Sequence, residues 1–230
     1  ETRASERQEG CMTEDEARTW LDQNFNVSRE TWEKLEAFIT FLKVEAARQN
    51  LISASTLDHI WARHIVDSAQ LLMLAPSEPG QWIDLGSGAG FPGIVVALLS
   101  DWHVVLVESR AKRIEYLNRA VVFLGLEGRT RVAGMPVERV EGQKYDVISA
   151  RAFAPLPKLL DLSARFSTDK TKWLLPKGRN AVNELEEARK AWDFDLSVEP
   201  SVTAPEAGIL VGTVRGTNIQ PASGARAGAA

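Results

Sequence analysis

The feature that most constrains the fold is a regular alternation of short apolar runs and helical segments that begins at Gln81. The runs typical of strands lie at 81–85, 103–107, 130–133, 145–149, 172–175, 194–198 and 209–214. Segments of helical length separate the earlier runs, at 91–99, 110–124 and 155–167. Strands joined by such helices form parallel βαβ units whose sheet is covered on both faces. We therefore expect an α/β fold with a Rossmann-like, doubly wound, mostly parallel sheet of seven strands.

The residues before this alternation have a helical pattern. Apolar side chains recur at three- and four-residue steps, at Trp32, Leu35, Phe38, Ile39, Leu42 and Ala46. Thr13 and Glu16 match a capping box, and a further helix is expected between Ser55 and Leu74. The sequence thus predicts four parts: a leader or cloning remnant at 1–11, a helical extension at 12–75, an α/β domain at 76–216 and a disordered tail at 217–230.

Composition excludes several classes of protein. Hydrophobic residues make up 44% and charged residues 25%, which is ordinary globular usage. No apolar run approaches the roughly 18 residues that suggest a membrane span, and no secretory signal pattern opens the chain. Cys11 is the single cysteine, so a disulfide within the chain is impossible. We expect a cytoplasmic monomer that does not associate with a membrane.

The charge is unevenly distributed along the chain. The formal net charge is −4, but residues 101–180 carry fifteen Lys or Arg against nine Asp or Glu. A local basic excess can bind phosphate even on an acidic protein, although a solvated surface of mixed charge explains the same numbers.

The strongest chemical signal is a glycine-rich loop between the first strand and the first helix of the alternation. It reads Asp84-Leu85-Gly86-Ser87-Gly88-Ala89-Gly90-Phe91. Glycines permit unusual backbone angles and let a ligand approach the main chain closely. The next helix would add a positive dipole end and free N–H groups. We expect Asp84, Gly86, Ser87, Gly88 and Gly90 to contact a cofactor.

Two cofactor classes compete for this loop. Gly88, Gly90 and Gly93 match the G-x-G-x-x-G of dinucleotide sites, with Glu108 about twenty residues beyond the loop to bind a ribose. The turn, however, comes earlier, at Gly86, and Asp84 precedes it. That arrangement resembles the first motif of S-adenosylmethionine-dependent methyltransferases. There Asp84 would attract the cofactor's ammonium directly or through water, and loop N–H groups would hold its carboxylate. Glu108 would accept hydrogen bonds from the ribose hydroxyls in either class.

Other catalytic chemistries fit the sequence poorly. It contains no phosphate loop of the G-x-x-x-x-G-K-[ST] type and no G-x-S-x-G nucleophile elbow. His59 and His64 are five residues apart and do not share a helix face, as metal ligands would. We therefore expect no metal site.

Several further blocks stand in order along the chain. They are Asn50-Leu51-Ile52, Arg63-His64-Ile65-Val66-Asp67-Ser68, Glu108-Ser109-Arg110-Ala111-Lys112-Arg113, Ser149-Ala150-Arg151-Ala152-Phe153-Ala154-Pro155-Leu156 and Leu175-Pro176-Lys177-Gly178. Together with the glycine loop, they make residues 30–215 resemble the RsmG (GidB) family of small-subunit ribosomal RNA methyltransferases. This resemblance implies transfer of a methyl group from S-adenosylmethionine to guanine N7 in a conserved loop of 16S ribosomal RNA.

The resemblance also implies roles for particular residues. Cofactor contacts are implied at Gly86, Phe91, Val137, Glu138 and Arg151. Arg151 and Lys177 lie at strand ends. They would position cofactor or RNA rather than transfer a proton, since the lone pair at guanine N7 needs no general base. The residues expected to contact RNA are Lys177, Arg179, Lys158, Arg110, Lys112 and Arg113. For Arg110, Lys112 and Arg113 a solvated helix face is the competing interpretation. Arg63, His64 and Asp67 fit either a hydrogen-bond network or a substrate role.

The chain departs from the family pattern in two places. Pro136 stands where an arginine usually precedes the adenine-contacting pair, and the loop from Pro205 to Gly208 lacks an arginine often found there. These departures leave alternatives open: a small-molecule methyltransferase, an NAD-dependent oxidoreductase, or an RNA-binding assembly factor without activity.

Overall fold

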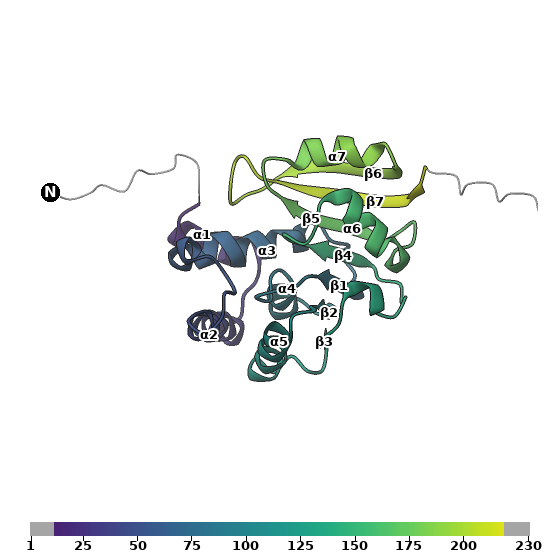
Figure 1. Ribbon diagram of the computed structural model, residues 1–230. Coiled ribbons are helices and arrows are strands. Elements are labelled where there is room, and N and C mark those ends of the chain that lie inside the picture. The colour runs from purple at the N-terminus through teal and green to yellow at the C-terminus, as the bar shows by residue number, and fades with distance from the viewer. Residues whose placement is uncertain (1–11, 219–230) are drawn as a thin grey trace, which may run out of the picture.

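The computed structural model describes residues 12–218, so the predicted leader at 1–11 and most of the predicted tail at 217–230 lie outside the described residues. A seven-stranded sheet forms the centre, with strand order β3-β2-β1-β4-β5-β7-β6 (Figure 1). Its strands are β1 (Gln81–Leu85), β2 (His103–Val107), β3 (Thr130–Ala133), β4 (Val147–Ala150), β5 (Lys172–Lys177), β6 (Trp192–Pro200) and β7 (Gly208–Thr217). The strands β1 to β5 pair in parallel, and β7 pairs antiparallel with both β5 and β6. The predicted doubly wound, mostly parallel sheet is confirmed.

Helices cover both faces of the sheet. They are α4 (Gly93–Leu99), α5 (Ala111–Phe123), α6 (Leu156–Ser163) and α7 (Ala181–Arg189). Because side chains alternate along a strand, Trp82, Val104 and Leu106 pack with α4 and α5 in one hydrophobic core. Ile83 and Val105 face the other core, which includes residues of α6 and α7. The sequence analysis missed α7.

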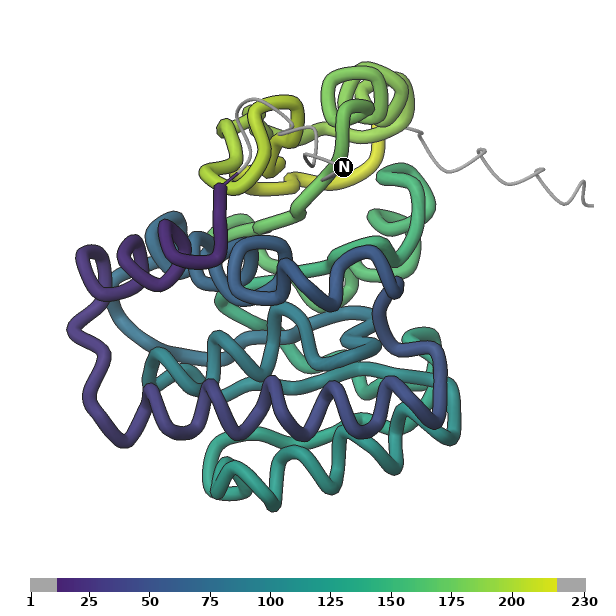
Figure 2. Tube along the Cα trace, turned by 90° about the vertical axis from the view of Figure 1, so that its left-hand side faces the viewer, coloured from purple at the N-terminus to yellow at the C-terminus, as the bar shows by residue number. Residues whose placement is uncertain are grey.

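The N-terminal extension adds a further layer outside α4 and α5 (Figure 2). It consists of α1 (Glu14–Asn24), α2 (Arg29–Ala46) and a continuous helical stretch that contains α3 (Asp67–Ala69). The capping box at Thr13 and Glu16 begins α1 as predicted. The stretch predicted as one helix from 55 to 74 is helical over most of its length. Its helix type changes, from a 3-10 segment at Ala54–His59 to a π-helical segment at Trp61–Val66. A π-helical segment of this kind often lies at a functional site.

The strand order reverses between β1 and β4, whose neighbours diverge on either side. In open α/β sheets, ligands bind at the carboxyl ends of the strands beside such a switch point. The fold therefore directs attention to the segments that follow β1, β2, β4 and β5.

Candidate functional site

The glycine loop after β1 has a backbone that only glycine adopts easily. Gly86, Gly88 and Gly90 have φ angles of 71°, 55° and 95°. The N–H groups of Gly86 and Ser87 donate to the Val107 carbonyl over 2.9 and 3.0 Å, and that of Gly90 donates to the Ser87 carbonyl over 2.7 Å. These loop amides therefore bond within the protein and fix the loop against the end of β2.

Asp84 lies beneath this loop with no exposed surface. Its Oδ1 accepts a hydrogen bond from Ser149 Oγ over 2.8 Å, and its Oδ2 accepts one from the Gly93 N–H over 3.2 Å. Burial raises the pKa of the Asp84 carboxyl to about 6. The carboxylate lines neither of the two cavities described below, and its present contacts support the loop from inside the protein.

A cavity of about 210 Å³ lies at the ends of β1, β2 and β3. Among the residues that line it are Gly86, Glu108, Arg110, Arg113, Val137 and Phe153. Glu108 Oε1 accepts from the N–H groups of Ser109 and Arg110 over 2.8 and 2.9 Å, and its Oε2 accepts from the Gly88 N–H over 3.1 Å. These donors hold the Glu108 carboxyl group in a fixed orientation at the cavity wall.

A second cavity, of about 510 Å³, lies at the ends of β4 and β5. Its polar lining includes Arg63, Asp67, Arg151, Lys177 and Glu184. Arg151 pairs with Asp67 over 2.9 Å, and Lys177 pairs with Glu184 over 2.8 Å. The charged groups of this cavity are thus arranged as two cation–carboxylate pairs.

Ala152 and Phe153 both line the two cavities, so they lie at the border between them. The Phe153 ring lies over the glycine loop: a Cβ atom added to Gly86 would come within 2.5 Å of Phe153 Cδ2. The preceding residue, Ala152, has a φ of 50°, which is unusual for a residue with a side chain. Strained backbone of this kind persists where the surrounding structure fixes it, often at ligand sites.

A hydrogen-bond network joins Arg151 to the N-terminal extension. The Arg151 guanidinium donates to the Arg63 carbonyl over 3.1 Å and contacts His64 Nδ1 over 2.6 Å. It lies 5.4 Å from the centre of the Phe91 ring. The His64 ring stacks on Phe91 at 4.8 Å. Burial, together with the charges of Arg151 and Arg63, lowers the pKa of His64 to about 3. His64 is therefore neutral near pH 7 and accepts the hydrogen bond from Arg151.

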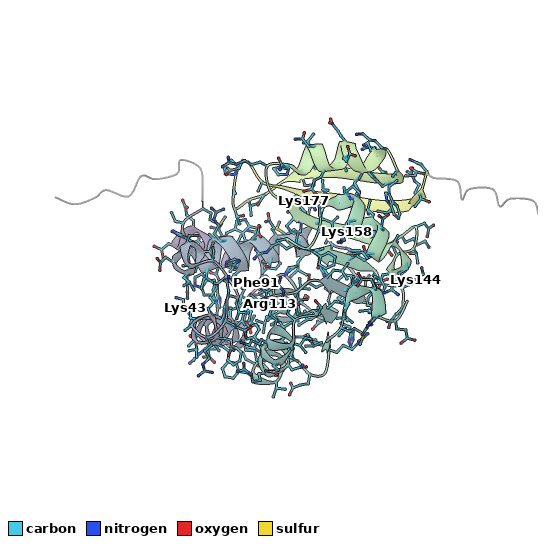
Figure 3. All side chains as sticks on the ribbon, in the orientation of Figure 1. Lys43, Phe91, Arg113, Lys144, Lys158 and Lys177 are labelled. Atoms are coloured by element: carbon cyan, nitrogen blue, oxygen red, sulfur yellow. The ribbon has the colours of Figure 1, made fainter. Side chains whose placement is uncertain are left out.

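The structure distributes the other predicted site residues between these regions. Val137 is buried beside the first cavity, whereas Glu138 is exposed and does not line it. Lys158, Arg110 and Lys112 are exposed. In the view of Figure 3, Lys158 and Lys177 lie on the side of α6 and β5, and Arg113 and Phe91 lie nearer the middle of the molecule.

Besides Lys177, two further predicted RNA contacts are already paired within the protein. Arg113 donates to the Asn50 carbonyl over 3.1 Å and lies 3.8 Å from Glu108. Arg179 pairs with Glu206 over 3.2 Å. Arg113 therefore belongs to the first cavity and its border with the extension, rather than to an open helix face.

The sequence analysis missed two contributors to the site. Phe153 was quoted within a motif but given no role, and its position over Gly86 has no signature in the sequence. Glu184 was missed with the whole of α7. The available signal was the spacing of Ala181, Leu185 and Ala188, which are the buried residues of that helix.

The family model described as rRNA small subunit methyltransferase G matches residues 31–209. The chain belongs to this family. It is 52% identical over 210 residues to the ribosomal RNA small subunit methyltransferase G of Zymomonas mobilis, an alignment that covers 88% of this chain and 94% of that protein. It is 56% identical over 200 residues to the protein of that name from Sphingopyxis alaskensis, with 86% and 85% of the two chains covered.

Solved structures support the same fold at much lower sequence identity. The ribosomal protein L11 methylase of Lactobacillus delbrueckii subsp. bulgaricus has a TM-score of 0.54 and 14% identity, over 65% of this chain and 77% of that one. MtNAS in complex with S-adenosylmethionine has a TM-score of 0.52 and 15% identity, over 90% and 86% of the two chains. These likenesses show a shared Rossmann-like fold.

Residues 12–218 contain no group of three or more His, Cys, Asp or Glu side chains that could hold a metal ion. Within the same range, none of the helices combines the length and the apolar character needed to span a membrane.

Proposed function

We propose that this protein transfers the methyl group of S-adenosylmethionine to N7 of a guanine in 16S ribosomal RNA. The observation that carries the proposal is the presence of two cavities at the carboxyl edge of the sheet, with Ala152 and Phe153 at their border. The cavity on one side presents the fixed carboxylate of Glu108 and the glycine loop, and the cavity on the other side presents two ion pairs. The first suits a nucleoside cofactor, and the second suits a polar base.

The residues around the first cavity fit S-adenosylmethionine. Glu108 would accept a hydrogen bond from a ribose hydroxyl, because a carboxylate has about four acceptor positions and three are used here. The main chain at Val137 and Glu138 would meet the adenine edge. Gly86 lets a ligand approach the backbone, and Asp84 and Phe91 support the loop from behind. When bound, the cofactor supplies a methyl group carried by a positively charged sulfur.

The second cavity would hold the guanine. Nitrogen N7 carries no proton, so its lone pair forms the new N–C bond without a general base. Arg151 and Lys177 act as positioning residues that hold the base and its backbone in line for transfer, and accurate alignment at about 3–3.5 Å can supply much of the rate. Asp67 and Glu184 provide negative charge beside a base that becomes positive during the reaction.

The RNA around the target would contact the basic groups beside the cavities. Arg110, Lys112 and Lys158 are exposed, and exposed Lys and Arg bind phosphate through a salt-dependent interaction. We place the reaction in the cytoplasm, where ribosomal subunits are assembled, and we propose that one copy of the chain is sufficient for it.

Substitution of a single atom in the RNA tests this function. Small subunits are reconstituted with 16S ribosomal RNA that carries either guanosine or 7-deazaguanosine at the target position, and transfer of a labelled methyl group is measured. We expect methylation of the guanosine subunits and none of the 7-deazaguanosine subunits, in which a carbon replaces N7. Equal labelling of both would refute transfer to N7, and labelling of neither would refute the proposed substrate.

A further inference from the structure

Glu184 has an unusual arrangement of partners at the wall of the second cavity. Its Oε2 accepts two hydrogen bonds, from Lys177 Nζ over 2.8 Å and from the Leu156 N–H over 2.9 Å. Its Oε1 has no hydrogen-bond partner within residues 12–218, and 28% of the side chain is exposed. One oxygen is therefore anchored by the protein while the other remains available to a ligand in the cavity.

The other carboxylate of the cavity is arranged differently. Asp67 Oδ2 accepts from Arg151 over 2.9 Å, and Asp67 Oδ1 accepts from Gln70 and Thr203 over 3.1 and 3.2 Å. Both oxygens of Asp67 are thus engaged in joining the extension to the α/β domain. Of these two carboxylates, Glu184 is the one that has an oxygen available to accept a hydrogen bond from a ligand.

The neighbouring cation completes a pattern of acceptor and donor. Lys177 Nζ donates to the Ala154 carbonyl over 3.2 Å and to Glu184 over 2.8 Å, and an ammonium has a third donor. Guanine presents the O6 acceptor next to the N1–H and N2 amino donors on its Watson–Crick edge. Adenine presents a donor and then an acceptor at the corresponding positions, so the same protein groups would repel it.

We propose that Glu184 is a specificity-determining residue that accepts hydrogen bonds from N1–H and the N2 amino group of the target guanine, with Lys177 donating to O6. This inference rests on the proposed function and adds the recognition of the base. The Phe153 ring at the border of the cavity offers an apolar face on which the same base can stack. Enzymes that extrude a base recognise it by hydrogen bonds to its Watson–Crick edge and hold it by stacking.

The test combines removal of a group from the base with removal of its partner from the protein. Reconstituted subunits carry guanosine or inosine at the target, and inosine lacks only the N2 amino group. Wild-type protein is compared with Glu184→Gln. The two donors that anchor Oε2 also fix the orientation of the glutamine amide, whose NH₂ group then takes the place of Oε1. The variant thus presents a donor to the donors of guanine.

We expect wild-type protein to prefer guanosine over inosine in kcat/KM by about 10- to 100-fold, the value of a hydrogen bond to a charged acceptor. Glu184→Gln should lower transfer to guanosine and bring this preference close to one. Glu186→Gln is the matched control, because Glu186 is an exposed residue of the same helix, and it should leave the preference unchanged. The ratio of the two substrates does not depend on the fraction of folded protein.

Two results would overturn the inference while leaving the proposed function in place. One is equal transfer by wild-type protein to guanosine and inosine. The other is a loss in Glu184→Gln that is equal for both bases, since this would show that Glu184 only holds Lys177. Absence of methylation on every guanosine-containing subunit would remove the proposed function and the inference together, and the comparison with 7-deazaguanosine identifies that case.

Discussion

Replacement of Gly86 by alanine tests its contact with Phe153 at the border of the two cavities. The φ angle of Gly86 is 71°, and a Cβ atom there would lie 2.5 Å from Phe153 Cδ2. Gly88 offers a matched control in the same loop. Its φ angle is 55°, but its added Cβ would meet nothing closer than Arg113 Nη1 at 3.5 Å. Gly86→Ala therefore introduces backbone strain and a clash, whereas Gly88→Ala introduces strain alone.

The magnitudes follow from these two contributions. A residue with a Cβ in the left-handed region costs about 1–2 kcal/mol, and forcing a packed ring aside costs about 1–3 kcal/mol more. We expect Gly88→Ala to lower the free energy of unfolding by about 1–2 kcal/mol and Gly86→Ala to lower it by about 2–5 kcal/mol. For a chain of this size each kcal/mol lowers Tm by roughly 2–4 °C.

The assay is thermal and urea unfolding of both variants, each made with Phe153 present and with Phe153→Ala. Removal of the ring should abolish the extra cost of Gly86→Ala and leave Gly88→Ala unchanged, which a double-mutant cycle detects as coupling of about 1–3 kcal/mol. Calorimetry with S-adenosylhomocysteine should show a weaker affinity for Gly86→Ala. Equal losses at the two glycines in both backgrounds would refute the position of Phe153 over Gly86.

Three further perturbations test the remaining features of the site. Lys177→Ala and Arg151→Ala should each lower methyl transfer to small subunits by about 100-fold through misplacement of the base, while circular dichroism shows that the fold is kept; full activity in either would exclude its positioning role. Because the folded pKa of His64 is about 3, the unfolded chain binds a proton near pH 6.5 that the folded chain does not, so this group makes stability fall as pH drops from about 6.5 towards 3. Asp84, with a folded pKa of about 6, has the opposite effect between about pH 4 and 6, so urea titrations at several pH values should show a steeper acid loss for Asp84→Asn and a shallower one for His64→Gln. Lys158→Gln should reduce the dependence of RNA binding on salt by about one phosphate contact, measured as the slope of log K against log salt, and an unchanged slope would place Lys158 outside the RNA interface.

The alternation of apolar runs was enough to predict the sheet because the central strands β1, β4 and β5 are buried along almost their whole length. The edge strand β6 instead alternates buried and exposed residues, which is also a pattern typical of a strand. Helix α7 was not predicted. The strand before it extends to Lys177, two residues beyond its expected end, and α7 begins soon afterwards, at Ala181. The long helix of the extension was predicted as regular, yet its hydrogen bonds change spacing around Trp61. At this point the Glu14 carboxylate accepts hydrogen bonds from the Trp61 and Ala62 N–H groups, a contact between residues far apart in the sequence that local periodicity does not show.

The residues of the candidate site could be named from the sequence, but their division between the two cavities could not be predicted. The glycine loop and Glu108 were identifiable because a glycine-rich turn after one strand, with a carboxylate at the end of the next strand, is a known cofactor-binding pattern. The ion pair between Arg151 and Asp67 joins residues 84 positions apart, and no spacing rule connects them. The direction of a charged side chain depends on its partners in space, so the sequence could name the cations without showing which of them face the cavity, the solvent or another residue.

The pairing of these cations bears on one of the two positions where the family's usual arginines are missing. The loop from Pro205 to Gly208 has no arginine, but Glu206 in that loop pairs with Arg179 from the segment after β5. A positive charge therefore reaches the loop from a neighbouring element, and Arg179 remains 76% exposed despite the pair. Since an exposed ion pair contributes little to stability, phosphate can replace Glu206 as its partner at small cost. We therefore expect Arg179 to meet an RNA phosphate here only when it releases Glu206, because the ion pair itself carries no net charge.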